Sequence, residues 1–172
     1  MPTAAGPDII FRLLEKEQKN TSQNLNRLYE VLTRLRYEGK QHLGRNIRET
    51  RALLVFFRKE VQAHMQLEEK TLFPFIGAHI PRLEPIIFLL LSEHDDFRSS
   101  LEELRCDLAK IKGSTIYPSR TIDKVTDLGT YFICLCRNHM WAETQSLYKI
   151  AFKELQLAER RKLIYRIQEA VR

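Results

Sequence analysis

Cysteine, glycine and proline are all scarce in this chain of 172 residues, which contains 3 Cys, 6 Gly and 6 Pro. A small, odd number of cysteines argues against a disulfide scaffold and favours a reducing compartment. Cys134 and Cys136 lack the spacing of a zinc-binding pair. Together with Cys106, they are expected to be buried free thiols. Because residues that break regular structure are few, long ordered elements are expected.

Long hydrophobic runs are also missing. The longest, IIFLLL at residues 86–91, is far shorter than the roughly 20 residues that a membrane-spanning helix needs. The N-terminal stretch MPTAAGPDII lacks the basic start and apolar core of a signal peptide. These absences predict a soluble, cytoplasmic protein with no membrane partner.

Charge of one sign is not concentrated anywhere in the chain. The 28 Lys and Arg residues against 22 Asp and Glu residues give a net charge of +6, spread along the sequence. A nucleic-acid-binding protein gathers its basic residues on one face, so no nucleic-acid partner is expected. The sequence also contains no nucleophilic triad, phosphate-binding glycine loop or dinucleotide fingerprint.

Apolar residues, 44% of the chain, recur at helical spacing almost throughout, and no stretch alternates as a strand does. The pattern predicts four long helices and a short last one, over residues 8–38, 46–75, 82–112, 119–155 and 157–171. Pro74 and Gly77 are expected to close the second helix and Gly113 the third. Residues 1–172 are therefore predicted to form one all-α domain, an up-down-up-down four-helix bundle with a short extra C-terminal helix.

One motif occurs twice, as HMQLEEKTLF at residues 64–73 and HMWAETQSLY at residues 139–148. Each copy places Glu four residues after His, on the same face of a helix. The first and third helices also correspond, because Glu17-Gln18 aligns with Glu93-His94 and leucines follow at the same spacing. The chain therefore reads as two helical hairpins related by a pseudo-twofold axis.

The repeated motif places charged groups on apolar stripes, which predicts a metal site. Carboxylates in a core are costly unless they are paired or ligated. The predicted metal ligands are His64, Glu68, His94, His139 and Glu143. A mixture of imidazole and carboxylate suits iron, manganese or zinc. Two carboxylates that can bridge favour two metal ions about 3.5–4 Å apart. Ferritin-like proteins use Glu-x-x-His instead, so a ferritin-like site is not expected.

The stretches HMQLEEKTLFPF, SEHDDF and HMWAETQSLY resemble the hemerythrin-like, or HHE cation-binding, family over most of the chain. The resemblance implies a four-helix bundle with a non-haem di-iron centre. Members of that family bind dioxygen or nitric oxide, sense iron or oxygen, or help to repair iron sites damaged by nitric oxide. By resemblance, Glu68 and Glu143 would bridge the metals, His94 and His139 would serve one iron, and His64 the other.

The chain departs from that family at two positions. The family has a His on the first helix where this chain has Gln18. Gln18, Glu17 or Glu15 could complete a lopsided di-iron site, water could leave a coordination position open, or only one metal could remain. Arg98 stands four residues after His94, where oxygen-carrying hemerythrins have a second His, which counts against simple oxygen carriage.

The function expected from these residues is a binding or sensing module rather than an enzyme. Its cofactor would be iron, as a pair of ions, with mononuclear iron, manganese or zinc as alternatives. Its ligand would be dioxygen, nitric oxide or iron itself. Two other functions stay open: iron-centre repair or oxidoreductase activity at an open di-iron site, and a metal-free bundle that acts through its surface. A homodimer also stays open.

Three further polar residues are expected to lie away from the metal. His42 and His79 should lie in solvent-exposed loops. Glu69 should lie in solvent or in an ion pair, because it points about 100° away from Glu68 on the helix.

Overall fold

The computed structural model describes residues 6–111 and 118–171, with the side chains of residues 6–13, 15 and 171 left aside. Within these residues the chain is helical and forms no strand. The helices are α1 (Gly6–Tyr37), α2 (Leu43–Phe56), α3 (Gln62–Leu67), α4 (Phe73–His79), α5 (Glu84–Lys110), α6 (Ser119–Ala142), α7 (Lys149–Glu154) and α8 (Leu157–Val171).

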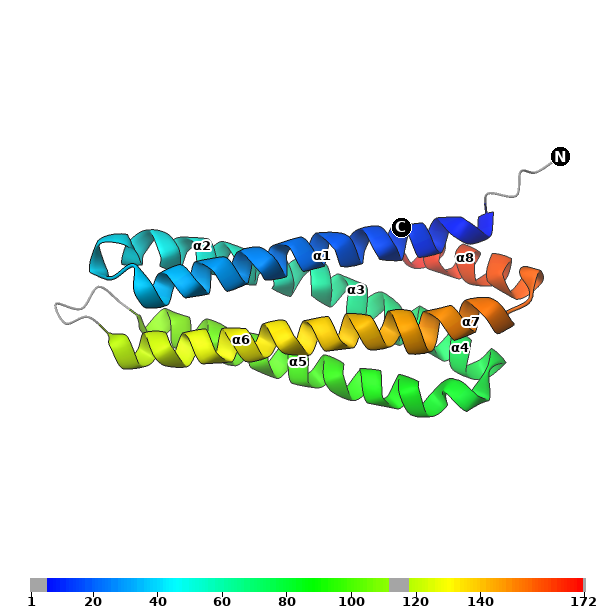
Figure 1. Ribbon diagram of the computed structural model, residues 1–172. Helices are drawn as coiled ribbons and strands as arrows, with labels where there is room; N and C mark the ends of the chain where they lie inside the picture. Colours follow the sequence, from blue (N-terminus) through cyan, green and yellow to red (C-terminus); the bar gives the residue numbers. More distant parts are fainter. Residues whose placement is uncertain (1–5, 112–117, 172) are drawn as a thin grey trace.

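These helices form four long rods that lie side by side (Figure 1). The first rod is α1, the second is α2 to α4, the third is α5, and the fourth is α6 with α7. α8 folds back at the end of the bundle and contacts α1 and α3. The predicted all-α four-helix bundle with an extra C-terminal helix is thus confirmed. None of the described helices is both long and apolar enough to cross a membrane.

The second rod differs from its prediction at both ends. It begins at Leu43 rather than at residue 46, and it continues through Pro74 to His79. Pro74 does not end the rod, because it lies in the first turn of α4, where a missing backbone N–H costs little. The chain instead turns at Ile80, whose φ of −134° is not helical.

The ends of the third and fourth rods agree more closely with the sequence pattern. α5 begins at Glu84, after a 3₁₀ turn over Pro81–Leu83, and ends at Lys110. The predicted stop signal at Gly113 lies outside the described residues, as does most of the loop that precedes Ser119.

The second and fourth rods contain π-helical segments that their sequence periodicity does not reveal. These segments are Phe57–Val61, Glu68–Leu72 and Glu143–Tyr148. Two of them begin at the Glu of each His-x-x-x-Glu motif, so the internal repeat extends to the backbone. Single π turns inside α-helices are common at functional sites, because they shift the register of the side chains that follow.

The interior consists of two apolar clusters on either side of a polar layer. One cluster, around Leu25, Phe57 and Phe132, joins α1, α2, α5 and α6. The other, around Phe73 and Leu147, lies toward the α4, α7 and α8 end, where buried Leu163 and Ile167 of α8 complete it. The predicted metal ligands occupy the layer between the two clusters.

α6 packs closely against α1 at Gly129. A Cβ atom at this position would lie 2.3 Å from Cδ1 of Leu32, which is a clash. Only glycine therefore allows the two helices this separation without a shift of Leu32.

Candidate metal centre

The five predicted ligands come together in the middle of the bundle, from the second, third and fourth rods. His64 and Glu68 lie one turn apart on the second rod, His94 on α5, and His139 and Glu143 one turn apart on the fourth rod. Glu68 and Glu143 are 0% exposed, and His94 is 1% exposed. The separations from Nε2 to the nearest carboxylate oxygen are 3.1 Å for His64 to Glu68, 3.4 Å for His94 to Glu68, and 2.9 Å for His139 to Glu143.

Four of these side chains offer ligand atoms to one point. Glu68, His94, His139 and Glu143 have donor atoms that all lie within 4.8 Å of one another. The Nε2 atoms of His94 and His139 are only 3.1 Å apart. His64 is not in this group, although it contacts Glu68. The arrangement is the predicted one, and the role of each side chain as a ligand stays a prediction.

Each of the three site histidines donates its Nδ1 hydrogen to a carboxylate. His64 Nδ1 lies 2.9 Å from Glu17, His94 Nδ1 lies 2.8 Å from Glu69, and His139 Nδ1 lies 2.7 Å from Glu93. When a carboxylate accepts the Nδ1 hydrogen, the neutral ring presents its Nε2 lone pair to a metal. The three rings are therefore held in the orientation that a metal ligand requires, and loss of the Nε2 proton leaves the tautomer that binds a metal.

The sequence does not predict these three carboxylates as partners of the histidines. Glu69 forms an ion pair, as expected, with Arg98, and it also accepts a hydrogen bond from His94, which was not expected; its side chain is 25% exposed. The signal was present in the sequence, since each carboxylate is the neighbour of an aligned site residue, Gln18, Glu68 or His94. Each one serves a histidine on a different rod, so the pairing requires the packing of the rods.

Each buried carboxylate has one oxygen that receives no hydrogen bond from the described residues and lies beside an imidazole Nε2 atom. These oxygens are Glu68 Oε2 and Glu143 Oε1, and no solvent reaches them. Oxygen atoms of this kind are rare and costly in native interiors. A cation between them and the two Nε2 atoms would satisfy all four donors. The residues present therefore fit a metal of the iron, manganese or zinc type.

The electrostatics of the two glutamates differ. Burial raises the pKa of the Glu68 carboxyl, but the charge and hydrogen bonds of His64 outweigh it and bring the pKa below its ordinary value. Burial and the charge of Glu68 raise the pKa of Glu143. Burial lowers the pKa of His139, yet Glu143 and Glu93 raise it to about 9. Without a metal, protons on the imidazoles compensate the carboxylates, so a metal that binds here must displace protons.

Gln18 reaches the site as a hydrogen-bond donor. Its Nε2 lies 3.4 Å from Glu143 Oε2, and its carbonyl oxygen accepts a hydrogen bond of 2.9 Å from the Thr144 hydroxyl. The carbonyl oxygen, which is the only atom of Gln18 that could bind a cation, thus faces Thr144 rather than Glu143. Of the two neighbours considered as substitutes, Glu17 is bonded to His64, and the side chain of Glu15 lies outside the described residues.

A cavity of about 470 Å³ adjoins the site. Its lining includes His64, His94 and His139 at the inner end, and exposed residues such as Asn20 and Lys70 toward the surface. The cavity therefore extends from the three imidazole rings to exposed residues of the first and second rods.

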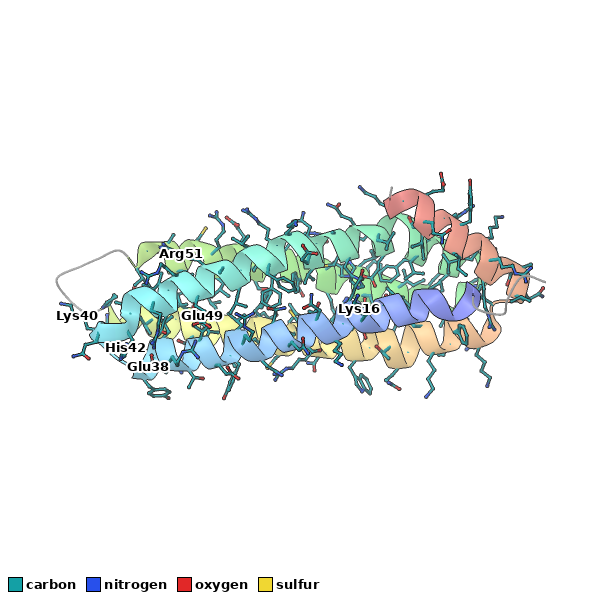
Figure 2. All side chains as sticks on the ribbon, turned by 90° about the horizontal axis from the view of Figure 1, so that it is seen from above. Lys16, Glu38, Lys40, His42, Glu49 and Arg51 are labelled. Atoms are coloured by element: carbon teal, nitrogen blue, oxygen red, sulfur yellow. The ribbon has the colours of Figure 1, made fainter. Side chains whose placement is uncertain are left out.

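The two remaining histidines lie away from this layer. His42 is exposed at the end of the bundle near Glu38 and Lys40 (Figure 2). His79 is also exposed, but it ends α4 instead of lying in a loop. Its ring stacks on Phe75 with centroids 4.1 Å apart, and its Nδ1 donates to the Phe75 carbonyl.

The cysteines differ in part from their prediction. All three are free, but only Cys136 is buried, while Cys106 and Cys134 lie on solvent-facing sides of their helices. Burial raises the pKa of the Cys136 thiol, so it remains protonated and fills space next to the site.

Comparison with known proteins agrees with the geometry. No curated protein and no solved structure matches the chain. The family model described as Hemerythrin HHE cation binding domain matches residues 9–151, which include all five predicted ligands. The resemblance seen in the sequence motifs is thus confirmed, and the chain belongs to the hemerythrin HHE cation-binding family.

Proposed function

We propose that the protein binds non-haem iron between its rods and uses it to bind or sense a small ligand such as dioxygen or nitric oxide. The observation that carries this proposal is that two buried oxygens, Glu68 Oε2 and Glu143 Oε1, receive no hydrogen bond from the described residues and converge with the Nε2 atoms of His94 and His139. A cation of charge two or three at this point neutralises both carboxylates and accepts both imidazoles.

The residues of the chain perform distinct tasks in this proposal. The two glutamates neutralise the ion, and the histidines hold it, with their rings kept in place by Glu69 and Glu93. The apolar clusters on both sides exclude bulk water, so electrostatic interactions in the layer are strong. Iron supplies the affinity for a diatomic ligand, which the cavity admits. Binding or sensing is preferred over simple oxygen carriage because Arg98 donates to Glu69 and offers no imidazole.

Metal reconstitution tests the proposal directly. The purified protein would be incubated anaerobically with Fe(II), Mn(II) or Zn(II), freed of unbound ions, and analysed for metal per chain. Iron retention is expected in the parent and in His79→Ala, whose exposed ring lies away from the layer, and loss is expected in His94→Ala. If the reconstituted parent holds none of the three metals above trace, the proposal fails.

The orienting carboxylates provide a second test. Glu69→Gln keeps the size of the side chain but weakens its acceptance of the His94 Nδ1 hydrogen. Loss of such a partner typically costs about 10–100-fold in metal affinity. The matched control is Glu102→Gln, because Glu102 is exposed and pairs with Arg105 instead. Competition titration with a chelator measures the affinities, and equal values for the two variants would contradict the assigned role.

A further inference from the structure

The internal repeat makes the site nearly symmetric, so each half can be compared with the other. Equivalent positions on the second and fourth rods differ by 75 residues, and those on the first and third by 76. The repeat retains the identical pairs His64 and His139, Glu68 and Glu143, and Glu17 and Glu93. It also retains their contacts, since Glu17 holds His64 as Glu93 holds His139.

The symmetry fails at two positions that touch each other. His94 corresponds to Gln18, and Glu69, which accepts the His94 hydrogen, corresponds to Thr144, whose hydroxyl donates to Gln18. One half therefore pairs an imidazole with an acceptor, as a metal ligand requires. In the other half, the Thr144 hydroxyl donates to the carbonyl oxygen of the Gln18 amide, and the NH₂ group of that amide lies toward Glu143.

The orientation of the Gln18 amide follows from its neighbours. The Thr144 hydroxyl lies 2.9 Å from the Gln18 carbonyl oxygen and 2.8 Å from the Met140 carbonyl oxygen. Its single hydrogen is shared between these two acceptors. Turning the amide around would set its carbonyl oxygen against the Glu143 carboxylate, where two acceptors would repel. The contacts with Thr144 and Glu143 therefore place the NH₂ group toward Glu143.

A third difference supplies another hydrogen-bond donor. Tyr148 corresponds to Phe73, and the Tyr148 hydroxyl donates to Glu68 Oε1. Phe73 has no hydroxyl, and it stacks on His94 with ring centroids 5.7 Å apart.

The four carboxylate oxygens are consequently divided into two sets. Toward His94 and His139, Glu68 Oε2 and Glu143 Oε1 have no hydrogen-bond partner among the described residues. Toward His64, Glu68 Oε1 and Glu143 Oε2 are bonded to the Tyr148 hydroxyl and the Gln18 amide. A second cation on the His64 side would have to displace both donors and would find a single imidazole there.

We propose that the centre takes one metal ion, on the side of His94 and His139, and that Gln18 and Tyr148 replace a second ion by hydrogen bonds to Glu68 and Glu143. This inference rests on the proposed metal-binding function. In it, His64 positions Glu68 and does not hold an ion of its own.

Metal stoichiometry tests the inference with the intact chain. The protein would be titrated with Fe(II) under anaerobic conditions, and metal per chain would be measured after removal of free ions, with Zn(II) as a redox-inert probe. One ion per chain is expected for the parent, for His64→Ala and for the control His79→Ala. After air oxidation, isolated ferric ions should give an electron paramagnetic resonance signal that a coupled ferric pair lacks.

A variant that restores the symmetry completes the test. Gln18→His, Thr144→Glu and Tyr148→Phe together copy the His94 half onto the other half, and this triple variant should bind two ions per chain. The control is Gln145→His, which adds an exposed imidazole to the same π segment and should leave one ion.

The outcomes separate this inference from the proposed function. Two ions per chain in the parent would overturn the single-ion inference and leave the metal-binding function intact. One ion in both the parent and a folded triple variant would show that these three residues do not determine the count, which also overturns the inference. No bound ion in the parent would overturn the proposed function itself.

Discussion

Replacing Glu143 by Gln should have opposite effects on stability with and without metal. Glu143 is fully buried, and its carboxylate lies within 4.8 Å of a ligand atom of Glu68. Two unit charges at that distance repel by about 3.5 kcal/mol at an effective dielectric constant of about 20. Glu143→Gln removes this repulsion together with the attraction to His139, and the raised pKa of Glu143 indicates that burial and repulsion outweigh that attraction. The metal-free variant should therefore be at least as stable as the metal-free parent.

With metal bound, the parent should be more stable than Glu143→Gln. An ion at about 100 times its dissociation constant adds about 2.7 kcal/mol to the free energy of unfolding of the parent. For a chain of this size, that corresponds to a rise of about 5–10 °C in Tm. The variant has lost a charged ligand atom and should show a much smaller rise.

Thermal unfolding followed by circular dichroism, with chelator and with added Fe(II) or Zn(II), measures both effects. Glu30→Gln is the matched control, because Glu30 is exposed on α1, and it should behave as the parent does. The reasoning would be refuted if metal-free Glu143→Gln were less stable than the metal-free parent by more than about 2 kcal/mol, as expected for loss of a structural hydrogen-bond network. An equal metal-induced rise in both proteins would refute it as well.

Two further predictions concern the scaffold. Gly129→Ala should lower Tm by about 2–4 °C, because the clash with Leu32 costs about 1–3 kcal/mol and the gain in helix propensity returns about 1; unchanged stability would mean that Leu32 moves freely. Asp107→Asn should cost about 1 kcal/mol at neutral pH, since hydrogen bonds from Lys110 and then Lys124 lower the pKa of this buried carboxyl. Because the folded-state pKa lies below the unfolded value of 3.8, the ionised carboxyl stabilises the fold above that pH, and this stabilisation is lost as the pH falls. Urea unfolding should therefore show that the difference in free energy of unfolding between the parent and Asp107→Asn shrinks below that pH.

The sequence predicted the rods because helical periodicity is a local signal. Leu25, Phe57 and Phe132 lie on apolar stripes, and all three are buried where the rods meet. The boundary errors have local causes too. Pro74 looks like a stop signal, but a helix tolerates it in a first turn, and the π segment ahead of it creates such a turn.

The candidate site was predictable where the motif repeats, and less so elsewhere. The spacing of His64 with Glu68 and of His139 with Glu143 places each pair on one face, as the structure shows. Glu68 and Glu69 contact different nitrogens of the same His94 ring. The periodicity of one helix does not say which neighbouring helix lies beside Glu69. In the structure that helix is α5, and its His94 donates a hydrogen bond to the Glu69 carboxylate.

The role of Gln18 needed the packed structure for the same reason. Alignment of the first and third rods shows that Gln18 replaces a histidine, but it leaves the direction of the amide open. That direction depends on Thr144 and Glu143, which belong to the fourth rod and lie more than 100 residues away in the sequence.

Anomalous diffraction from crystals of iron-loaded protein, collected at the iron absorption edge, tests the central claim most directly. The account predicts a peak inside the bundle, about 2.0–2.2 Å from the Nε2 atoms of His94 and His139 and from carboxylate oxygens of Glu68 and Glu143. A peak outside this layer, or no peak there in protein that retains stoichiometric iron, would contradict it.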